Sequence, residues 1–247
     1  MNAVVITGGS RGIGAATAVL AGKNGYSVVV NYKGNEAAAT GVVEKIAANG
    51  GRAIAVAGDV SVEADVVRLF DVTISEFGQI DALVNNAGVL EQHMPLENMS
   101  AERIIRVLNT NVLGSLLCAR EAIKHMSTEN GGAGGSIVNV SSIAAKLGSP
   151  NEYVDYGASK GAVDTFTVGL ATEVAGCGIR VNAVRPGVIY TEIHATGGEP
   201  DRVDRVKHSV PMKRGGTADE VAQAVLWLMS GNASYTTGAF IDVSGGR

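Results

Sequence analysis

The chain has 247 residues, with 20 basic and 24 acidic side chains and a formal net charge of −4. This balance supplies no cationic surface for nucleic acid or for an anionic membrane, so neither is expected as a partner. No apolar run approaches the ~20 residues that span a bilayer, and the N-terminus has the pattern of a core strand rather than of a signal peptide. A cytoplasmic globular protein is therefore expected, in which the 33 glycines serve turns and close backbone approaches.

Short β-branched runs alternate with longer amphipathic stretches along the whole chain, which is typical of β-α units around a parallel sheet. Strands are predicted at Ala3–Thr7, Ser27–Asn31, Arg52–Ala57, Ala82–Asn85, Ser136–Val140, Arg180–Arg185 and Ala239–Val243. Helices are predicted at residues 12–24, 35–49, 61–77, 100–126, 156–176 and 217–230. Most of the strand segments are continuously apolar, which indicates that helices cover both faces of the sheet. We therefore predict one doubly wound α/β domain, residues 1–247, with a seven-stranded parallel sheet.

Several helix starts are marked by local signals, and one long segment has no periodic pattern. Ser61 and Ser100 are predicted N-caps, and Thr217 with Glu220 forms a predicted capping box. Residues 192–216 have no clear periodicity, and segments of this length in compact domains usually form lids or binding loops. This segment is therefore predicted to be a short substrate lid.

The first predicted strand leads directly into a helix through a glycine-rich turn, Thr7-Gly8-Gly9-Ser10-Arg11-Gly12-Ile13-Gly14. Glycines let the backbone turn tightly and let phosphate oxygens approach the helix N-terminus, where unpaired N–H groups favour an anion. Such a turn could simply connect two elements. Its place between a strand and a helix instead indicates a dinucleotide-binding site.

The spacing T-G-x-x-x-G-x-G resembles that of the short-chain dehydrogenase/reductase family, and the resemblance extends through nearly the whole chain. Further family motifs are matched by Asp59-Val60, Asn85-Asn86-Ala87-Gly88, Asn111-Val112-Leu113-Gly114, Ser141-Ser142, Tyr156-Gly157-Ala158-Ser159-Lys160 and Pro186-Gly187 with Thr191. The resemblance implies a Rossmann fold, a nicotinamide cofactor, and a homotetramer built on helices 100–126 and 156–176 and on the C-terminal strand. The cofactor contacts expected from the motifs and the turn are Gly8, Ser10, Arg11, Gly12, Ile13, Gly14, Asn31, Tyr32, Lys33, Asp59, Val60, Asn86, Ala87, Gly88, Tyr156, Lys160, Pro186, Gly187 and Thr191.

The tip of the second strand bears on the choice between NAD(H) and NADP(H). An acidic residue there would accept a hydrogen bond from the ribose 2′-hydroxyl and repel a 2′-phosphate. The sequence continues instead as Asn31-Tyr32-Lys33, and Arg11 stands in the neighbouring turn. Two cations can form a phosphate pocket, so NADP(H) is the preferred cofactor, with NAD(H) use possible because Lys33 does not exclude a hydroxyl.

Four residues are predicted to be catalytic: Asn111, Ser142, Tyr156 and Lys160. Tyr156 and Lys160 share a helix face at i and i+4, where the ammonium would lower the phenol pKa and prepare Tyr156 as general acid/base. Ser142 follows a strand and can stabilise charge on a substrate oxygen; Ser141 is the competing candidate. The resemblance implies that the Asn111 backbone carbonyl holds a water that relays protons to Lys160, whereas an exposed helical Asn is the alternative.

The substrate is less clearly indicated. The predicted lid carries five basic and four acidic residues between positions 192 and 214, so a strongly anionic substrate is not indicated. Glu152 and Tyr153 are expected near the pocket mouth. The four histidines have no ligand spacing, so no metal site is predicted.

Two branches of the family are similar to this chain. One is glucose-dehydrogenase-like, and the other is the 3-oxoacyl-carrier-protein reductases, several of which have a basic residue where this chain has Thr172. That departure favours a small polar ketone, aldehyde or sugar over a 3-oxoacyl thioester. A non-catalytic NADP(H)-binding sensor is a remote alternative, because all four predicted catalytic residues are present.

Overall fold

Seven parallel strands form the central sheet in the order β3-β2-β1-β4-β5-β6-β9. The structure is a computed structural model that describes residues 2–247. The strands of this sheet are β1 (Ala3–Ile6), β2 (Ser27–Tyr32), β3 (Arg52–Ala57), β4 (Ala82–Asn85), β5 (Gly135–Val140), β6 (Ile179–Pro186) and β9 (Phe240–Val243). The predicted fold class and all seven predicted strands are confirmed, with ends that differ by at most one residue.

The direction in which the chain crosses the sheet reverses between β1 and β4. From β1 the chain moves outward through β2 and β3, and then returns to place β4 on the other side of β1. Loops that follow these two strands therefore diverge and leave a crevice at the carboxyl edge, where ligands bind in sheets of this kind.

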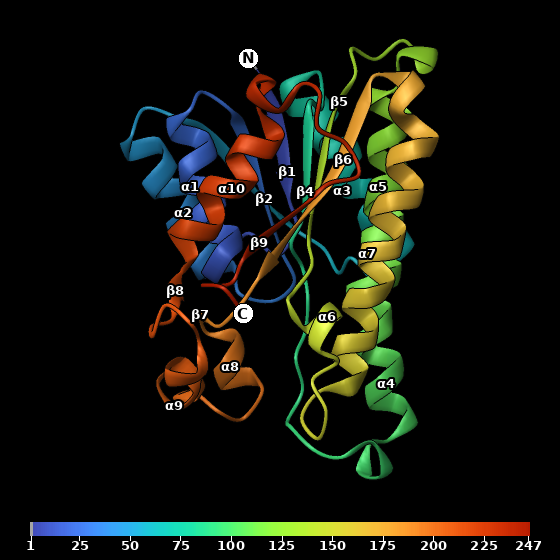
Figure 1. Cartoon of the computed structure of the whole chain (residues 1–247). Coiled ribbons are helices and arrows are strands. Elements are labelled where there is room, and N and C mark those ends of the chain that lie inside the picture. The colour runs from blue at the N-terminus through green and yellow to red at the C-terminus, as the bar shows by residue number, and fades with distance from the viewer. Residues whose placement is uncertain (1) are drawn as a thin grey trace.

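Helices cover both faces of the sheet (Figure 1). The first face is covered by α1 (Gly12–Lys23), α2 (Glu36–Ala48) and α10 (Ala218–Met229). The second is covered by α3 (Glu63–Phe77), α5 (Gly114–Met126) and α7 (Val154–Val174). Additional short elements are α4 (Ala101–Leu108), α6 (Ala144–Leu147), α8 (Ile193–Thr196), α9 (Arg202–Val206) and the 3-10 turns Leu96–Asn98, Thr128–Asn130, Ala175–Cys177, Lys207–Ser209 and Gly231–Ala233.

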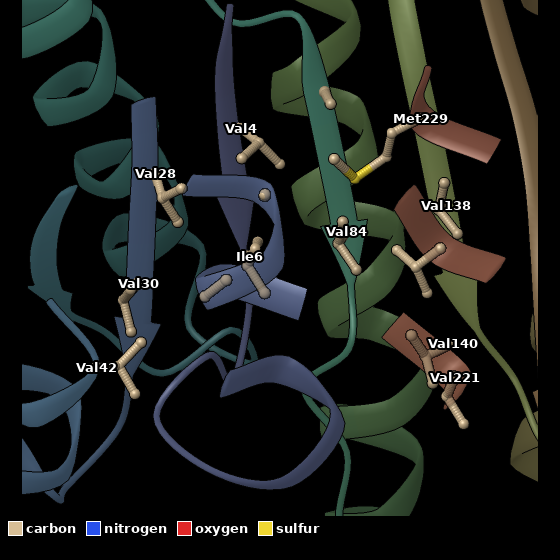
Figure 2. Close-up of a cluster of buried hydrophobic side chains, with 14 of the residues drawn as sticks. Val4, Ile6, Val28, Val30, Val42, Val84, Val138, Val140, Val221 and Met229 are labelled. Atoms are coloured by element: carbon tan, nitrogen blue, oxygen red, sulfur yellow. The ribbon is translucent and has the colours of Figure 1, made fainter. Parts of the chain in front are cut away.

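Alternate residues of the inner strands enter two separate hydrophobic clusters. Val4 and Ile6 of β1 point into the cluster that Figure 2 shows, together with Val42 of α2 and Val221 of α10. Val5 points to the opposite cluster, among side chains of α3, α5 and α7. Because both faces are buried, β1 is apolar throughout, as the sequence pattern predicted.

Two details differ from the sequence-based predictions. The predicted helix 100–126 is interrupted by a π-helical turn, Asn109–Leu113, between α4 and α5. Ser61 does not cap α3: Val62 occupies the N-cap position, and the Ser61 hydroxyl donates to the Asp59 carboxylate at 2.7 Å. The predicted caps at Ser100 and at Thr217 with Glu220 are confirmed.

The segment predicted to be a lid lies at the carboxyl edge of the sheet, below the strands in Figure 1. It contains α8, α9 and the 3-10 turn Lys207–Ser209. Two short parallel strands, β7 (Ile189–Tyr190) and β8 (Gly216–Thr217), pair with each other and so bring the two ends of the segment together. Among residues 2–247, none of the helices has the length and apolarity needed to cross a bilayer.

Candidate active site

Two cavities lie side by side at the carboxyl edge, with volumes of about 560 Å³ and 360 Å³. They share five lining residues: Ile13, Asn86, Gly88, Thr191 and Ile193. The larger cavity is also lined by the predicted cofactor residues Gly8, Ser10, Arg11, Gly12, Asn31, Tyr32, Lys33, Asp59, Val60 and Ala87. The smaller one is lined by Ser142, Tyr156, Lys160, Pro186 and Gly187. Gly14 and Asn111 line neither cavity.

The glycine-rich turn has the shape that a phosphate site requires. Gly8 and Gly12 have positive φ angles of 59° and 53°, which disfavour other residues. A Cβ on Gly14 would lie 2.4 Å from the Gly8 carbonyl oxygen, so the first turn of α1 packs directly against the preceding loop. No side chain caps α1 and its first turn has no acidic residue. Its N–H groups can therefore bind the anionic pyrophosphate of a dinucleotide.

Side-chain hydrogen bonds attach this turn to the end of β4. The Asn86 amide donates to the carbonyl oxygens of Thr7 and Gly8 at 2.9 and 3.0 Å. The Thr7 hydroxyl accepts from the backbone N–H groups of Asn86 and Ala87, each at 3.0 Å. These contacts fix both sides of the crevice relative to each other.

The far end of the larger cavity contains an ion pair that the sequence did not predict. The Lys33 ammonium contacts the Asp59 carboxylate at 2.6 Å. Partial burial raises the Asp59 pKa, but hydrogen bonds from Lys33 and Ser61 outweigh it and hold the pKa below its usual range. The Lys33 side chain remains 73% exposed, so its ammonium can also reach a ligand in the cavity.

The helix α7 presents Tyr156 and Lys160 to the smaller cavity, as the i, i+4 spacing predicted. The Lys160 ammonium lies 5.6 Å from the centre of the Tyr156 ring and donates to the Val140 carbonyl oxygen at 2.7 Å. Ser142 follows β5 and lines the same cavity. The hydroxyl of the competing Ser141 is buried and donates to Asp164 at 2.6 Å, which favours Ser142.

Burial has the largest effect on the pKa values of Tyr156 and Lys160. It raises the pKa of Tyr156, and an interaction with Ser142 lowers that pKa only in part. Burial also lowers the pKa of Lys160 to about 8, against the opposing effect of Asp164. The Tyr156 pKa is therefore raised, not lowered as the sequence analysis expects, because burial disfavours the phenolate.

Asn111 lies in the π-helical turn and is completely buried. Its side-chain oxygen accepts from the Val89 N–H at 2.8 Å, and its amide donates to Ser159 at 3.0 Å. The alternative of an exposed helical Asn is thus wrong. The Asn111 backbone carbonyl accepts from the Ser115 hydroxyl at 2.9 Å, and its predicted contact with water stays a prediction.

The segment 192–216 contacts the loop before α7 through charged side chains. Both carboxylate oxygens of Glu152 accept hydrogen bonds from Arg202, one of them at 3.1 Å. Arg202 also donates to Glu199 at 2.9 Å, and its guanidinium lies 5.0 Å from the centre of the Tyr153 ring. Glu152 and Tyr153 line the smaller cavity, as expected.

Among residues 2–247, no cluster of His, Cys, Asp and Glu is suited to a metal ion.

Comparison with known proteins agrees with this geometry. A family model described as "Enoyl-(Acyl carrier protein) reductase" matches residues 8–247. The chain is 58% identical over 247 residues to the uncharacterized oxidoreductase YgfF of Escherichia coli strain K12, with complete coverage of both chains. It is 41% identical to glucose 1-dehydrogenase 2 of Bacillus subtilis strain 168, over 98% of this chain and 93% of the relative.

A solved structure is also similar. The 3-ketoacyl-(acyl-carrier-protein) reductase from Brucella melitensis, complexed with NADH, superposes with a TM-score of 0.92 at 36% identity, covering 100% of this chain and 98% of that one. This chain belongs to the short-chain dehydrogenase/reductase family. As a member of that family it is an NAD(P)-dependent oxidoreductase that acts on CH–OH groups of small molecules.

One feature of this short-chain dehydrogenase/reductase was missed by sequence reasoning. The Arg103 guanidinium and the Asp155 carboxylate form a buried ion pair beside Tyr156. No contact between these two residues was predicted from the sequence. The two residues are far apart along the chain and on different helices, so no local pattern could reveal the pair.

Proposed function

We propose that this protein is an NADP(H)-dependent oxidoreductase that interconverts a carbonyl and a secondary alcohol on a small polar ketone, aldehyde or sugar. The observation that carries the proposal is that Ser142, Tyr156 and Lys160 line one cavity, which adjoins the groove behind the glycine-rich turn. Bound NADP(H) would supply or accept the hydride. The protein's own groups would position the substrate and move the proton.

Each of these side chains has a distinct role in the proposed mechanism. The Ser142 hydroxyl donates a hydrogen bond to the substrate oxygen and stabilises charge that develops there. The Tyr156 phenol gives its proton to that oxygen during reduction. Its raised pKa keeps it protonated at neutral pH, the state that a general acid needs. Lys160 has a pKa of about 8 and is therefore protonated at neutral pH, where its positive charge favours loss of that proton. Asn111 holds the surrounding turn through Val89 and Ser159.

The cofactor preference rests on the end of β2. No carboxylate follows directly after this strand, while Lys33 and Arg11 both line the larger cavity. The carboxylate that stands nearby, Asp59, is already paired with Lys33. This arrangement supports NADP(H), with the 2′-phosphate held by the two cations, and NAD(H) as a weaker alternative.

A second candidate function is the reduction of 3-oxoacyl thioesters. It is supported by the Brucella melitensis structure, which is named as a 3-ketoacyl-(acyl-carrier-protein) reductase. Thr172 argues against it, since this exposed position on α7 offers no cation to an acidic carrier. Turnover of acetoacetyl thioesters at a higher kcat/KM than small hydroxylated ketones would favour this candidate. A non-catalytic sensor would bind NADPH and turn over neither.

We also propose a homotetramer in the cytoplasm. Ile105 and Leu108 of α4, Leu116 of α5 and Val168 of α7 are 39–56% exposed, and such apolar side chains on neighbouring helices suit a subunit interface. Sedimentation velocity would test the assembly. A monomer at micromolar concentration would contradict it.

The decisive experiment compares Tyr156→Phe with the wild type in reduction of small ketones by NADPH. The variant should lose roughly 10²–10⁴-fold in kcat, the contribution that general acid catalysis typically makes, while NADPH affinity stays nearly unchanged. Tyr235→Phe is the matched control, since Tyr235 is fully exposed. Unchanged turnover in Tyr156→Phe would overturn the proposed mechanism.

A further inference from the structure

A carboxylate that has no role in the proposed mechanism lies next to Lys160 along one face of α7. It belongs to Asp164, four residues after Lys160. Its side chain is 14% exposed, and it lines neither cavity of the candidate site. Any effect of Asp164 on the reaction must therefore act through neighbouring groups.

Both oxygens of the Asp164 carboxylate accept hydrogen bonds from other parts of the fold. Oδ1 accepts from the hydroxyl of Ser141, which follows β5, at 2.6 Å. Oδ2 accepts from Nε of Arg185 in β6 at 2.9 Å. The Arg185 guanidinium in turn lies 3.8 Å from the centre of the Phe240 ring. Asp164 thus attaches α7 to the ends of two neighbouring strands.

Ser141 stands between two residues that bear on proton transfer. The carbonyl oxygen of Val140 accepts from the Lys160 ammonium at 2.7 Å. On the other side, Ser142 carries the hydroxyl that interacts with the Tyr156 phenol. A rotation of the backbone at Ser141 would move both groups. The hydrogen bond from Ser141 to α7 therefore restrains the carbonyl and the hydroxyl together.

The negative charge of Asp164 also acts on Lys160. Burial lowers the Lys160 pKa, and the Asp164 carboxylate opposes that decrease. The Tyr156 phenol is neutral because burial raises its pKa. Other charged groups on the elements around Lys160 are themselves in ion pairs: Arg103 of α4 with Asp155, Lys146 of α6 and Arg185 of β6 with Asp242, and Arg202 with Glu152. Asp164 is thus the carboxylate that favours the charged form of Lys160.

We propose that Asp164 is a positioning residue of the active site, which fixes the end of β5 through Ser141 and stabilises the positive charge of Lys160. The inference rests on the proposed function and adds to its four residues a fifth that lines neither cavity. The two effects can be separated by substitution. Ser141→Ala removes only the hydrogen bond, whereas Asp164→Asn removes the charge and leaves Arg185 its contact with Asp242.

The first test compares the pH profiles of kcat/KM for ketone reduction by NADPH. The wild type should lose activity on the alkaline side as Lys160 loses its proton. Asp164→Asn should move this loss to lower pH by roughly 0.5–1 unit, because the nearby carboxylate no longer favours the ammonium. Ser141→Ala should lower kcat roughly 2- to 10-fold without moving the profile. The control Asp71→Asn, at an exposed position of α3, should do neither.

The second test does not depend on turnover. Lysine labelled with ¹³C at the ε-carbon reports the titration of Lys160 by NMR in the cofactor-free protein, and its signal is assigned by its absence from Lys160→Met. The wild-type signal should titrate near pH 8, and the Asp164→Asn signal at lower pH. Ser141→Ala and Asp71→Asn should titrate as the wild type does.

The two tests distinguish failure of this inference from failure of the reductase proposal. If the wild type reduces no ketone, the reductase proposal fails, while a shifted NMR titration still supports the action of Asp164 on Lys160. An unchanged titration in Asp164→Asn would overturn the inference. An equal shift in Asp71→Asn, or wild-type kcat in an active Ser141→Ala variant, would overturn it as well.

Discussion

The guanidinium of Arg103 and the carboxylate of Asp155 are joined by two hydrogen bonds, from Nε to Oδ2 at 2.8 Å and from Nη2 to Oδ1 at 3.2 Å. The same Oδ1 accepts from the backbone N–H of Tyr156 at 2.9 Å. Arg103 also donates to the Gln92 carbonyl oxygen. The pair thus connects α4, the first turn of α7 and the loop after β4 directly beside the proposed acid–base residue.

Removing one charge of this pair should destabilise the protein strongly. Asp155→Asn or Arg103→Met leaves the other charge buried without its partner, which typically costs 3–5 kcal/mol. We expect a decrease of about 3–5 kcal/mol in the free energy of unfolding, measured by urea denaturation. Arg106→Met is the control, because Arg106 forms an exposed pair with Glu91 and should change stability little. Equal effects of the buried and exposed substitutions would contradict the expected role.

The cofactor preference should depend on two cations. Fluorescence titration of the wild type should give tighter binding of NADPH than of NADH. The double variant Lys33→Ala/Arg11→Ala should weaken NADPH binding about tenfold or more, because charge-assisted contacts to the phosphate are lost and the Asp59 carboxylate becomes unpaired. NADH binding should change little. Lys23→Ala, at the far end of α1, should leave both affinities unchanged. Equal binding of the two cofactors in every variant would mean that these cations do not select the phosphate.

The stability of the cofactor-free protein should respond to pH through Lys160. Its pKa is about 8 in the folded protein, whereas an unfolded lysine has a pKa near 10.4. Between these values the unfolded chain binds more protons than the folded one, so this residue makes stability rise with pH, by up to ~3 kcal/mol. Below pH 8 the lysine is charged in both states and the rise is absent. Unfolding of Lys160→Met and of the exposed control Lys45→Met, followed from pH 7 to 10.5, should show the rise only in the control.

The contact between Glu152 and Arg202 should control access to the smaller cavity. Glu152→Gln weakens the connection between the loop before α7 and the segment 192–216, so we expect a higher KM for the ketone and faster proteolysis within that segment. Cofactor affinity should be unchanged. Asp204→Asn is a matched control, because Asp204 pairs with Lys207 inside the segment and does not contact the loop. Identical proteolysis of both variants would argue that Glu152 does not hold the segment in place.

The arrangement of the main elements could be predicted because each long element carries its own repeat pattern. The continuously apolar β1, which a glycine-rich turn joins to α1, is one example, since its residues alone indicate burial on both faces. The spacing of Tyr156 and Lys160 likewise fixes their common helix face. By contrast, the two-residue strands β7 and β8 and the one-turn helices α6 and α8 are too short for any periodicity. Their conformation depends on contacts with other parts of the fold rather than on a local sequence pattern.

The parts of the candidate site that were missed depend on contacts between distant segments. The sequence shows Lys33 and Asp59 as separate charges, but only the pairing of β2 with β3 brings their positions close enough for an ion pair. The raised pKa of Tyr156 depends on the depth of the cavity, which no spacing reveals. The hydrogen bonds of Asp164 with Ser141 and Arg185 likewise depend on the placement of β5 and β6 beside α7.

The order of the strands along the chain determines when the residues of each cavity are synthesised. Val4 pairs with Ala82, 78 residues further along the chain, and contacts of such long range form slowly. Most residues of the larger cavity precede residue 90, while most of the smaller cavity comes from residues 140–202. The growing chain therefore contains the dinucleotide half long before the substrate half. Enzymatic turnover therefore requires the segments that are synthesised last as well as the dinucleotide half.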